Sequence, residues 1–284
     1  MMQVGLVLGG GGARGLAHIG VLQALEEYNI EVVAISGCSI GALIGAFYAA
    51  GKTSAEMQDM VARLPYYKLL HLGEFGGLLG GKGIEDFLTL HLPTTFEELT
   101  IPLSMTTVDV QEGKLLVLRS GRLVPAIRAS SALPGILSPV RYEGRYLVDG
   151  GLLNNLPVDV IHTMTLAPVI AVDVAAPHNR HLPFESKTTH MFDQLGALLQ
   201  GKVNPFENVF SRGLTVELFM KAFDVPQRLL TEMRLSMNPP EVLIRPDLDN
   251  QFGIEDFRRA AEAISQGYQA AKQALAAWQS MSTQ

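Results

Sequence analysis

The most constraining feature of this chain is a G-x-S-x-G pattern between a short apolar run and an apolar helical stretch. Its residues are Gly37, Cys38, Ser39, Ile40 and Gly41, and the apolar run before it covers 32–35. A serine on such a tight strand-to-helix turn takes a strained backbone conformation, and the flanking glycines let neighbouring elements approach closely. Its hydroxyl then projects above the sheet, beside the N–H groups that begin the helix. The pattern indicates a nucleophilic Ser39, with a glycine-lined turn needed only for packing as the alternative.

Apolar runs and helical patterns alternate on both sides of this motif. Residues 4–8 form an apolar run next to a glycine cluster, which is typical of a strand buried on both faces. A helix is predicted over 13–28, and the run at 32–35 completes a strand, helix, strand unit. Further strands are predicted at 103–108, 115–118, 145–148, 169–174 and 242–244. This alternation predicts an α/β fold with helices on both faces of a mostly parallel sheet.

The end of the chain and two irregular segments have patterns of their own. From 254 onward, apolar residues recur at alternating steps of three and four, which predicts a long amphipathic helix packed on the core. Segments 64–83 and 183–240 carry Met and Phe among prolines and glycines without one sustained period. We interpret them either as a lid or acyl-chain lining, because flexible apolar side chains adapt to a variable ligand, or as a peripheral helical subdomain.

Charge and cysteine content exclude several classes of protein. The formal charge is −6 and no long run of Lys or Arg is present, so we expect no nucleic-acid partner. The single cysteine, Cys38, excludes an intrachain disulfide and a cysteine-based metal cluster, and favours a reducing compartment. The first residues lack the basic region and cleavage site of a secretory signal. We therefore expect a cytoplasmic protein.

A second motif follows the first predicted strand. It reads Gly9-Gly10-Gly11-Gly12-Ala13-Arg14-Gly15. A dinucleotide site would also need an acidic residue at the end of the second strand, and a P-loop would need Gly-Lys-Ser/Thr, and neither is present. Successive glycine amides can instead point at the oxyanion formed at Ser39. We interpret Gly10, Gly11, Gly12, Ala13, Arg14 and Gly15 as an oxyanion hole, in which Arg14 orients the loop or adds positive potential.

A third motif is Val148-Asp149-Gly150-Gly151, a carboxylate at the end of a predicted strand. Gly150 and Gly151 permit a close approach of the backbone. Taken alone, Asp-Gly is also an ordinary turn dipeptide.

Together the three motifs resemble those of the patatin-like phospholipase family, in its bacterial patatin-like or neuropathy-target-esterase-like form. That family combines a glycine-rich oxyanion loop, a G-x-S-x-G elbow and a later D-G-G or D-G-A, in this order. The runs at 129–139 and 152–157 also look like the family's neighbouring blocks. The resemblance covers roughly 4–174.

The resemblance implies a three-layer α/β/α fold and a catalytic dyad, with Ser39 as the nucleophile and Asp149 as the general base. It implies acyl-ester substrates and neither a metal nor an organic cofactor. A patatin-like catalytic core is then expected over 1–175, and helical, lid-like and closing segments of the same domain over 176–284. Burial near an apolar site must raise the proton affinity of Asp149, since an ordinary aspartate is a weak base. We also expect any membrane contact to be peripheral and transient.

Two alternatives stay open. A Ser-His-Asp esterase is compatible with the chain order, because His162, His178, His181 and His190 follow Asp149. We expect each histidine, His18 included, to be a surface or capping residue instead. The second alternative is a lipid-binding regulatory protein on the same fold with little turnover.

Overall fold

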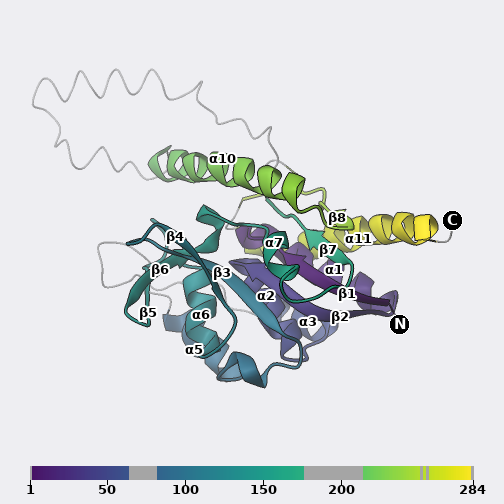
Figure 1. Ribbon diagram of the computed structural model, residues 1–284, viewed down its shortest axis with the longest axis horizontal. Helices are drawn as coiled ribbons and strands as arrows, with labels where there is room; N and C mark the ends of the chain where they lie inside the picture. The colour runs from purple at the N-terminus through teal and green to yellow at the C-terminus, as the bar shows by residue number, and fades with distance from the viewer. Residues whose placement is uncertain (1, 64–81, 176–213, 250–251, 254–255, 283–284) are drawn as a thin grey trace, which may run out of the picture.

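The computed structural model describes residues 2–63, 82–175, 214–249, 252–253 and 256–282 (Figure 1). It has an α/β fold around a sheet ordered β5-β6-β3-β2-β1-β7-β8, with β4 also paired to β3. The strands are β1 (Met2–Leu8), β2 (Ile30–Cys38), β3 (Leu103–Asp109), β4 (Lys114–Leu118), β5 (Val140–Tyr142), β6 (Arg145–Asp149), β7 (Val169–Val172) and β8 (Val242–Ile244).

The sheet is mostly parallel, as the sequence predicts. Within the described residues, β1, β2, β3, β7 and β8 run parallel to their neighbours in this set. β4, β5 and β6 form an antiparallel extension on β3. All the strands predicted from apolar runs are present, and β5 is an addition that the sequence analysis did not predict.

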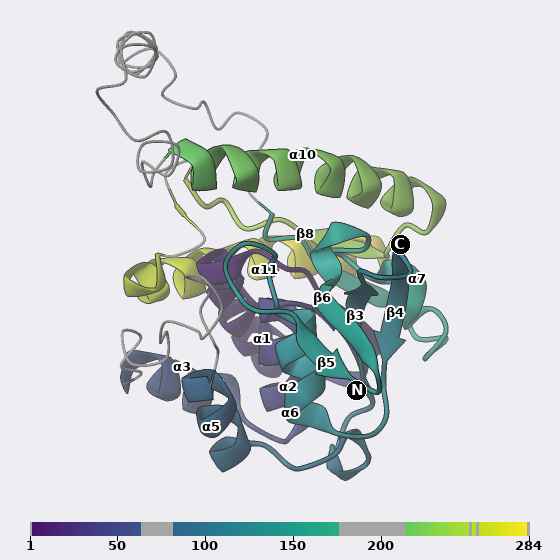
Figure 2. The ribbon, with the colours of Figure 1, turned by 90° about the vertical axis from the view of Figure 1, so that its left-hand side faces the viewer.

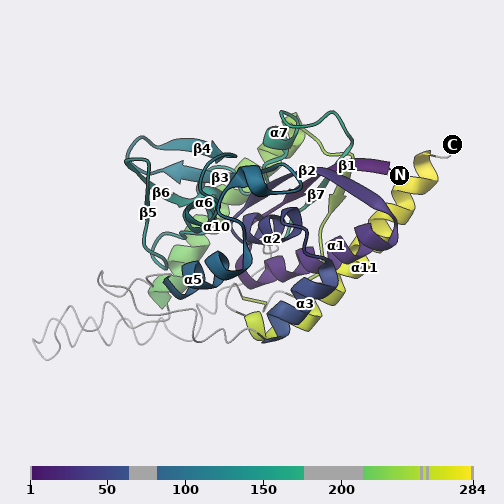
Figure 3. The same ribbon diagram turned by 90° about the horizontal axis from the view of Figure 1, so that it is seen from below.

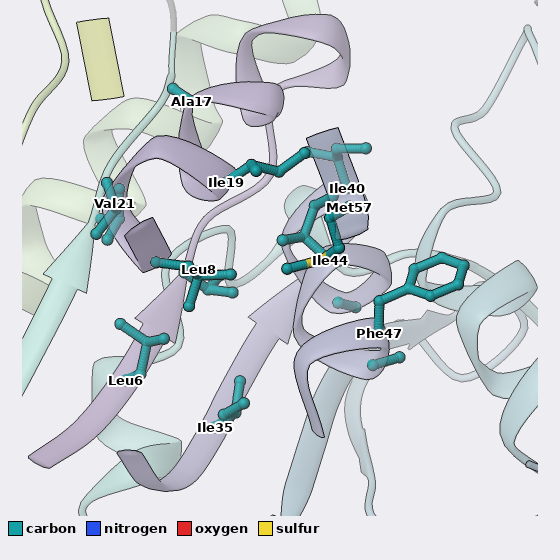
Figure 4. Close-up of a cluster of buried hydrophobic side chains, with 14 of the residues drawn as sticks. Leu6, Leu8, Ala17, Ile19, Val21, Ile35, Ile40, Ile44, Phe47 and Met57 are labelled. Carbon is teal, nitrogen blue, oxygen red and sulfur yellow. The ribbon is translucent and has the colours of Figure 1, made fainter. Parts of the chain in front are cut away.

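One face of the sheet is covered by helices from along the whole chain. These are α1 (Ala17–Glu27), α2 (Ile40–Ala49), α3 (Ser54–Arg63), α5 (Lys82–His91), α6 (Leu123–Ser130) and α11 (Ala260–Ser282). Leu6, Leu8 and Ile35 point from the strands into the main core, which they share with side chains of these helices. Figure 4 shows Ile40 and Ile44 of α2 in this core, so the helix that follows Ser39 is anchored by its apolar side chains.

The opposite face is covered by α7 (Val158–Ile161) and α10 (Leu214–Met237). Val7 and Ala34 alternate with the residues of the main core and enter a second, smaller cluster with Ile161 and Leu235. In Figure 2, α10 lies at the top of the view, and α3 and α5 lie at the bottom. The molecule therefore has three layers, α/β/α.

The C-terminal helix closes the main core, as predicted. α11 runs beside α1 (Figure 3), and the two helices touch through glycines. A Cβ atom on Gly20 would lie 1.9 Å from the carbonyl oxygen of Ile264, and one on Gly267 would lie 1.9 Å from that of Ala17. Only glycine permits this backbone approach.

Part of the segment interpreted as irregular is one long helix. α10 spans Leu214–Met237 with Pro226 inside it, whereas no sustained period was found over 183–240. The reason is that apolar residues lie on both of its sides: Leu235 is buried, while Leu229 and Met233 are exposed. Because the solvent-facing side of α10 is apolar too, polar and apolar residues do not alternate at the spacing by which an amphipathic helix is recognised. Residues 64–81 and 176–213 of the two irregular segments lie outside the described residues.

Candidate active site

Ser39 occupies a strained turn between β2 and α2. β2 ends at Cys38, α2 begins at Ile40, and Ser39 has φ 52° and ψ −122°. Such a conformation costs a non-glycine residue about 1–3 kcal/mol. The flanking glycine Gly41 is required by packing, because a Cβ there would lie 2.0 Å from the carbonyl oxygen of Leu8. The turn therefore has the geometry expected of a nucleophile elbow.

The pairing of β2 and β6 with β3 places Asp149 next to Ser39. β2 is parallel to β3, and its last residue, Cys38, lies opposite Thr106. β6 is antiparallel to β3, and its last residue, Asp149, lies opposite Thr107. Along this stretch β4 occupies one edge of β3. β2 and β6 therefore both pair with the opposite edge, one after the other, and their ends face each other. Adjacent residues of β3 thus bring the two strand ends together.

The carboxylate of Asp149 is buried and surrounded by donors. Its Oδ1 accepts a hydrogen bond of 2.8 Å from the Gly151 N–H, and the Cys38 Sγ lies 3.6 Å from the same oxygen. The side chain of Ser39 also faces this carboxyl and lowers its pKa. Burial raises the pKa of Asp149 from 3.8 to about 6, and the interactions with Gly151, Ser39 and Cys38 oppose the increase. A carboxylate of this kind can accept a proton near neutral pH.

Ser130 and Ala132 contact the two sides of the site. The Ser130 Oγ accepts a hydrogen bond of 3.0 Å from the backbone N–H of Ser39. Two residues later, the Ala132 carbonyl accepts one of 3.0 Å from the Asp149 N–H. These residues belong to the block at 129–139 that resembles the family, but the sequence analysis gave Ser130 no role.

The glycine loop after β1 lies against the elbow. The Gly9 N–H donates to the Val172 carbonyl at 3.0 Å, and the Gly10 N–H donates to the Asn155 carbonyl at 3.2 Å. The Asn155 side chain donates back to the Gly10 carbonyl at 3.0 Å. A Cβ on Gly10 would lie 3.3 Å from the Cβ of Ser39, so this stretch of backbone borders the nucleophile.

The amides that follow in the loop begin a helical turn. A 3-10 helix, η1 (Gly12–Leu16), starts here with Gly11 as its N-cap residue. The first N–H groups of a helix have no acceptor within it and are available to an anion. The Arg14 N–H differs, because it donates to the Gly11 carbonyl at 3.3 Å. Gly11 and Gly12 are therefore the loop positions best suited to bind an oxyanion.

Arg14 is buried and bonded to backbone carbonyls. Its Nε donates to Val174 at 3.0 Å, and its Nη1 donates to Phe252 at 3.2 Å. The side chain thereby ties the glycine loop to the end of β7 and to the segment before α11. These contacts favour the loop-orienting role over direct contact with an oxyanion.

The histidines do not share one environment. His18 is fully buried, which corrects the expectation of a surface residue, and its Nε2 lies 2.8 Å from the Gly9 carbonyl oxygen. Burial lowers the pKa of His18 from 6.5 to about 4, so the ring is neutral at physiological pH. Val21 and Leu22, three and four positions later on the same helix face, are buried as well. His162 is exposed as expected, whereas His178, His181 and His190 lie outside the described residues.

The glycines after Asp149 are in close contact with their surroundings. A Cβ on Gly150 would lie 2.4 Å from the Thr106 carbonyl oxygen, and one on Gly151 would lie 2.5 Å from the Gln227 Nε2. Gln227 belongs to α10, so this helix borders the base motif. Gln227 and Asn155 could not be recognised from the sequence as site residues, because a single amide side chain gives no local signal.

The described residues contain neither a candidate metal site nor a candidate membrane span. Among the described residues, no group of three or more His, Cys, Asp or Glu side chains is arranged to hold a metal ion. In the same part of the chain, no helix combines the length and apolar character needed to cross a bilayer.

Comparisons with known proteins agree on one family. The family model for patatin-like phospholipases matches residues 6–162, more than half of the 284 residues. Lysophospholipase NTE1 of Cryptococcus neoformans var. neoformans is 37% identical over 186 aligned positions, which cover 61% of this chain and 11% of that protein. Neuropathy target esterase sws of Drosophila melanogaster is 35% identical over 218 positions, covering 72% of this chain and 15% of that protein.

Two further comparisons cover nearly the whole chain. Patatin-like phospholipase domain-containing protein 6 of Mus musculus is 31% identical over 290 positions, covering 97% of this chain and 21% of that protein. The chain thus spans between 11% and 21% of the lengths of these three relatives. Among solved structures, VipD from Legionella pneumophila aligns with 97% of this chain and 67% of its own, with a TM-score of 0.58 and 14% identity. At that identity, the likeness concerns the fold alone.

Proposed function

Since the chain belongs to the patatin-like phospholipase family, we propose that it is a serine lipid acyl hydrolase, in which Ser39 and Asp149 cleave carboxylic esters of lipids. The observation that carries this proposal is the meeting of two strand ends, which brings Ser39 on its strained turn next to the buried carboxyl of Asp149. A nucleophile within reach of a base is the arrangement that acyl transfer requires.

In the first step, the Ser39 Oγ attacks the ester carbonyl carbon and its proton passes to Asp149. The pKa of about 6 supports this role, because the carboxylate is ionised at neutral pH and still basic enough to accept a proton. The tetrahedral intermediate carries a negative charge on the former carbonyl oxygen. We assign the stabilisation of that charge to the N–H groups of Gly11 and Gly12, since Gly10 and Arg14 donate theirs to carbonyls of the protein.

In the second step, the intermediate collapses and the bond to the alcohol oxygen breaks. Asp149 returns its proton to that oxygen, and the acyl group stays on Ser39 as an ester. A water molecule then attacks the acyl-enzyme while Asp149 accepts a proton from it. The second intermediate collapses, the fatty acid leaves, and the proton returns to the Ser39 Oγ. No metal or organic cofactor takes part in this scheme.

The substrate proposal is a phospholipid or lysophospholipid ester, because one relative bears the name lysophospholipase. We also propose peripheral contact with a lipid surface through α10. Its side chains Val225, Leu229, Met233 and Met237 follow one another at steps of four and are exposed. Exposed apolar stripes of this kind bind partners or lipid. The same helix carries Gln227, which borders the base motif. The cytoplasmic location stays a prediction.

The test is ester hydrolysis by the purified chain, measured on p-nitrophenyl butyrate and on lysophosphatidylcholine. We expect activity in the wild type and in Ser131→Ala, and a loss of at least a thousandfold in Ser39→Ala and Asp149→Asn. Activity close to wild type in Ser39→Ala would refute the proposal. Retention of a fluorescent fatty acid without turnover of either ester would favour the lipid-binding alternative.

Histidine variants separate the dyad from a Ser-His-Asp triad. His162→Ala, His178→Ala, His181→Ala and His190→Ala should each keep most of the wild-type activity. Loss of activity in one of them, with the fold intact, would replace the dyad by a triad.

A further inference from the structure

Ser130, the last residue of α6, is bonded to the backbone of the nucleophile. Its Oγ accepts the hydrogen bond of 3.0 Å from the Ser39 N–H, and its side chain is fully buried. Ser130 is therefore neither the nucleophile nor the base, and it is fixed against the turn that presents Ser39.

We propose that Ser130 is a positioning residue, whose hydroxyl fixes the Cys38–Ser39 peptide so that the Ser39 Oγ stays directed at Asp149. The inference rests on the proposed function and deepens it, because it assigns a role to a side chain that does not react.

The conformation of Ser39 explains why its N–H needs an acceptor. The angle φ describes rotation about the bond between N and Cα, and at Ser39 it is 52°, in the left-handed region. Relaxation to an ordinary φ turns the Cys38–Ser39 peptide and moves the side chain relative to the sheet. Ser39 also precedes α2, where N–H groups have no acceptor in the helix. The Ser130 hydroxyl supplies that acceptor and opposes the relaxation.

The same short segment also holds the base. The Ala132 carbonyl accepts the Asp149 N–H at 3.0 Å, two residues after Ser130. The end of α6 and the turn after it therefore contact the end of β2 through a side chain and the end of β6 through the backbone. A change at Ser130 releases the nucleophile alone, because the backbone bond to Asp149 remains.

The chain provides a matched control one residue further on. Ser131 is only half-buried, and its N–H continues the helix by donating to the Ile127 carbonyl at 3.0 Å. Ser131→Ala removes the same hydroxyl from the same segment without touching Ser39. It therefore reports the general cost of a serine to alanine change at this end of α6.

The experiment compares Ser130→Ala, Ser130→Thr and Ser131→Ala with the wild type, each as the full chain. The readouts are kcat and KM on p-nitrophenyl butyrate, the rate of Ser39 labelling by a fluorophosphonate, and the thermal midpoint. We expect Ser130→Ala to lower kcat and the labelling rate together by at least tenfold, with KM within twofold. Ser130→Thr, which keeps the acceptor, should restore a large part of kcat. The thermal midpoint of Ser130→Ala should stay near that of Ser131→Ala.

Three outcomes overturn the inference. The first is a kcat of Ser130→Ala within twofold of wild type. The second is a loss that Ser131→Ala shares. The third is a loss that follows unfolding, with a thermal midpoint well below that of Ser131→Ala and no recovery in Ser130→Thr. Ser39→Ala distinguishes the two proposals: if it is inactive while Ser130→Ala is fully active, the proposed function stands and only the role of Ser130 fails.

Discussion

Ser39 and Asp149 lie at the ends of two strands that pair with the same edge of β3 from opposite directions. β2 runs parallel to β3 and β6 runs antiparallel, so their last residues lie opposite Thr106 and Thr107. A parallel sheet alone would place the carboxyl ends of its strands side by side. Here the antiparallel extension directs the end of β6 toward the end of β2. The buried carboxylate of Asp149 therefore lies next to Ser39 on its strained turn.

Burial of Asp149 makes the fold dependent on pH. Its pKa is raised from 3.8 to about 6, so the folded state holds this proton more tightly than the unfolded state. The contribution of this group to the free energy of unfolding is fully present below pH ~4. It is lost as the pH rises to about 6, and the total loss is about 3 kcal/mol. Asp149→Asn removes the titration. Its free energy of unfolding relative to wild type should therefore increase by about 1–3 kcal/mol between pH 3.5 and pH 7.5. Urea unfolding at several pH values measures this, and a difference that does not vary with pH contradicts it.

The same pKa controls activity, because only the ionised carboxylate accepts a proton. We expect kcat/KM to rise with pH through a midpoint of about 6 and to level off above it. The Cys38 thiol lies 3.6 Å from the Asp149 Oδ1, and its hydrogen bond lowers the pKa of the carboxyl. Cys38→Ala should move the midpoint to higher pH, and Cys38→Ser, which offers a stronger donor, should move it to lower pH. Coincident profiles for the two variants would assign Cys38 to packing alone.

Gly267 allows α11 to pack against α1. A Cβ at this position would lie 1.9 Å from the Ala17 carbonyl oxygen, a backbone atom that cannot turn away. Gly267→Ala should lower the free energy of unfolding by about 1–3 kcal/mol or more, as overpacked cores do. Ser265→Ala, on the exposed side of the same helix, is the control and should have little effect. Urea unfolding compares the two, and equal stability would show that α11 does not depend on this contact.

The exposed stripe on α10 gives a prediction about lipid surfaces. Leu229→Asp and Met233→Asp each place a charge where we propose contact with lipid, so co-sedimentation with phosphatidylcholine vesicles should fall several-fold. Hydrolysis of soluble p-nitrophenyl butyrate should stay near wild type. Leu166→Asp is the matched control, because Leu166 is fully exposed but precedes β7, at the end of the strand away from the site. Equal binding by all three variants would contradict a role for α10.

Elements with strong local signals could be predicted from the sequence. The apolar runs located the parallel strands, because strands buried on both faces are continuously apolar. The turn at Ser39 followed from a glycine pattern between a strand and a helix. The β5 strand, Val140–Tyr142, was missed because an arginine interrupts it, whereas the equally short β8 is apolar throughout. A helical subdomain was one interpretation of the segment that holds α10, but the helix itself could not be delimited because both of its sides are apolar.

Relationships across the chain could not be predicted by the same means. The meeting of Ser39 with Asp149 depends on which edge of β3 receives β6, and no local pattern encodes that choice. The contact from Ser130 to Ser39 joins residues that are 91 positions apart. A serine among alanine, leucine and proline gives no indication of what its hydroxyl contacts. The expectation of a surface His18 was wrong, although the apolar Val21 and Leu22 on the same helix face were a signal of its burial, and its contact with the glycine loop had no local signal.

The most direct test of the account is fluorophosphonate labelling followed by intact mass measurement and peptide mapping, on the wild type and on Asp149→Asn. The reagent reacts with serines that are activated as nucleophiles. The account predicts a single adduct on Ser39 in the wild type and at least a hundredfold slower labelling in Asp149→Asn. An adduct on another serine, or equal labelling rates in the two proteins, would contradict the assignment of Ser39 and Asp149 as nucleophile and base.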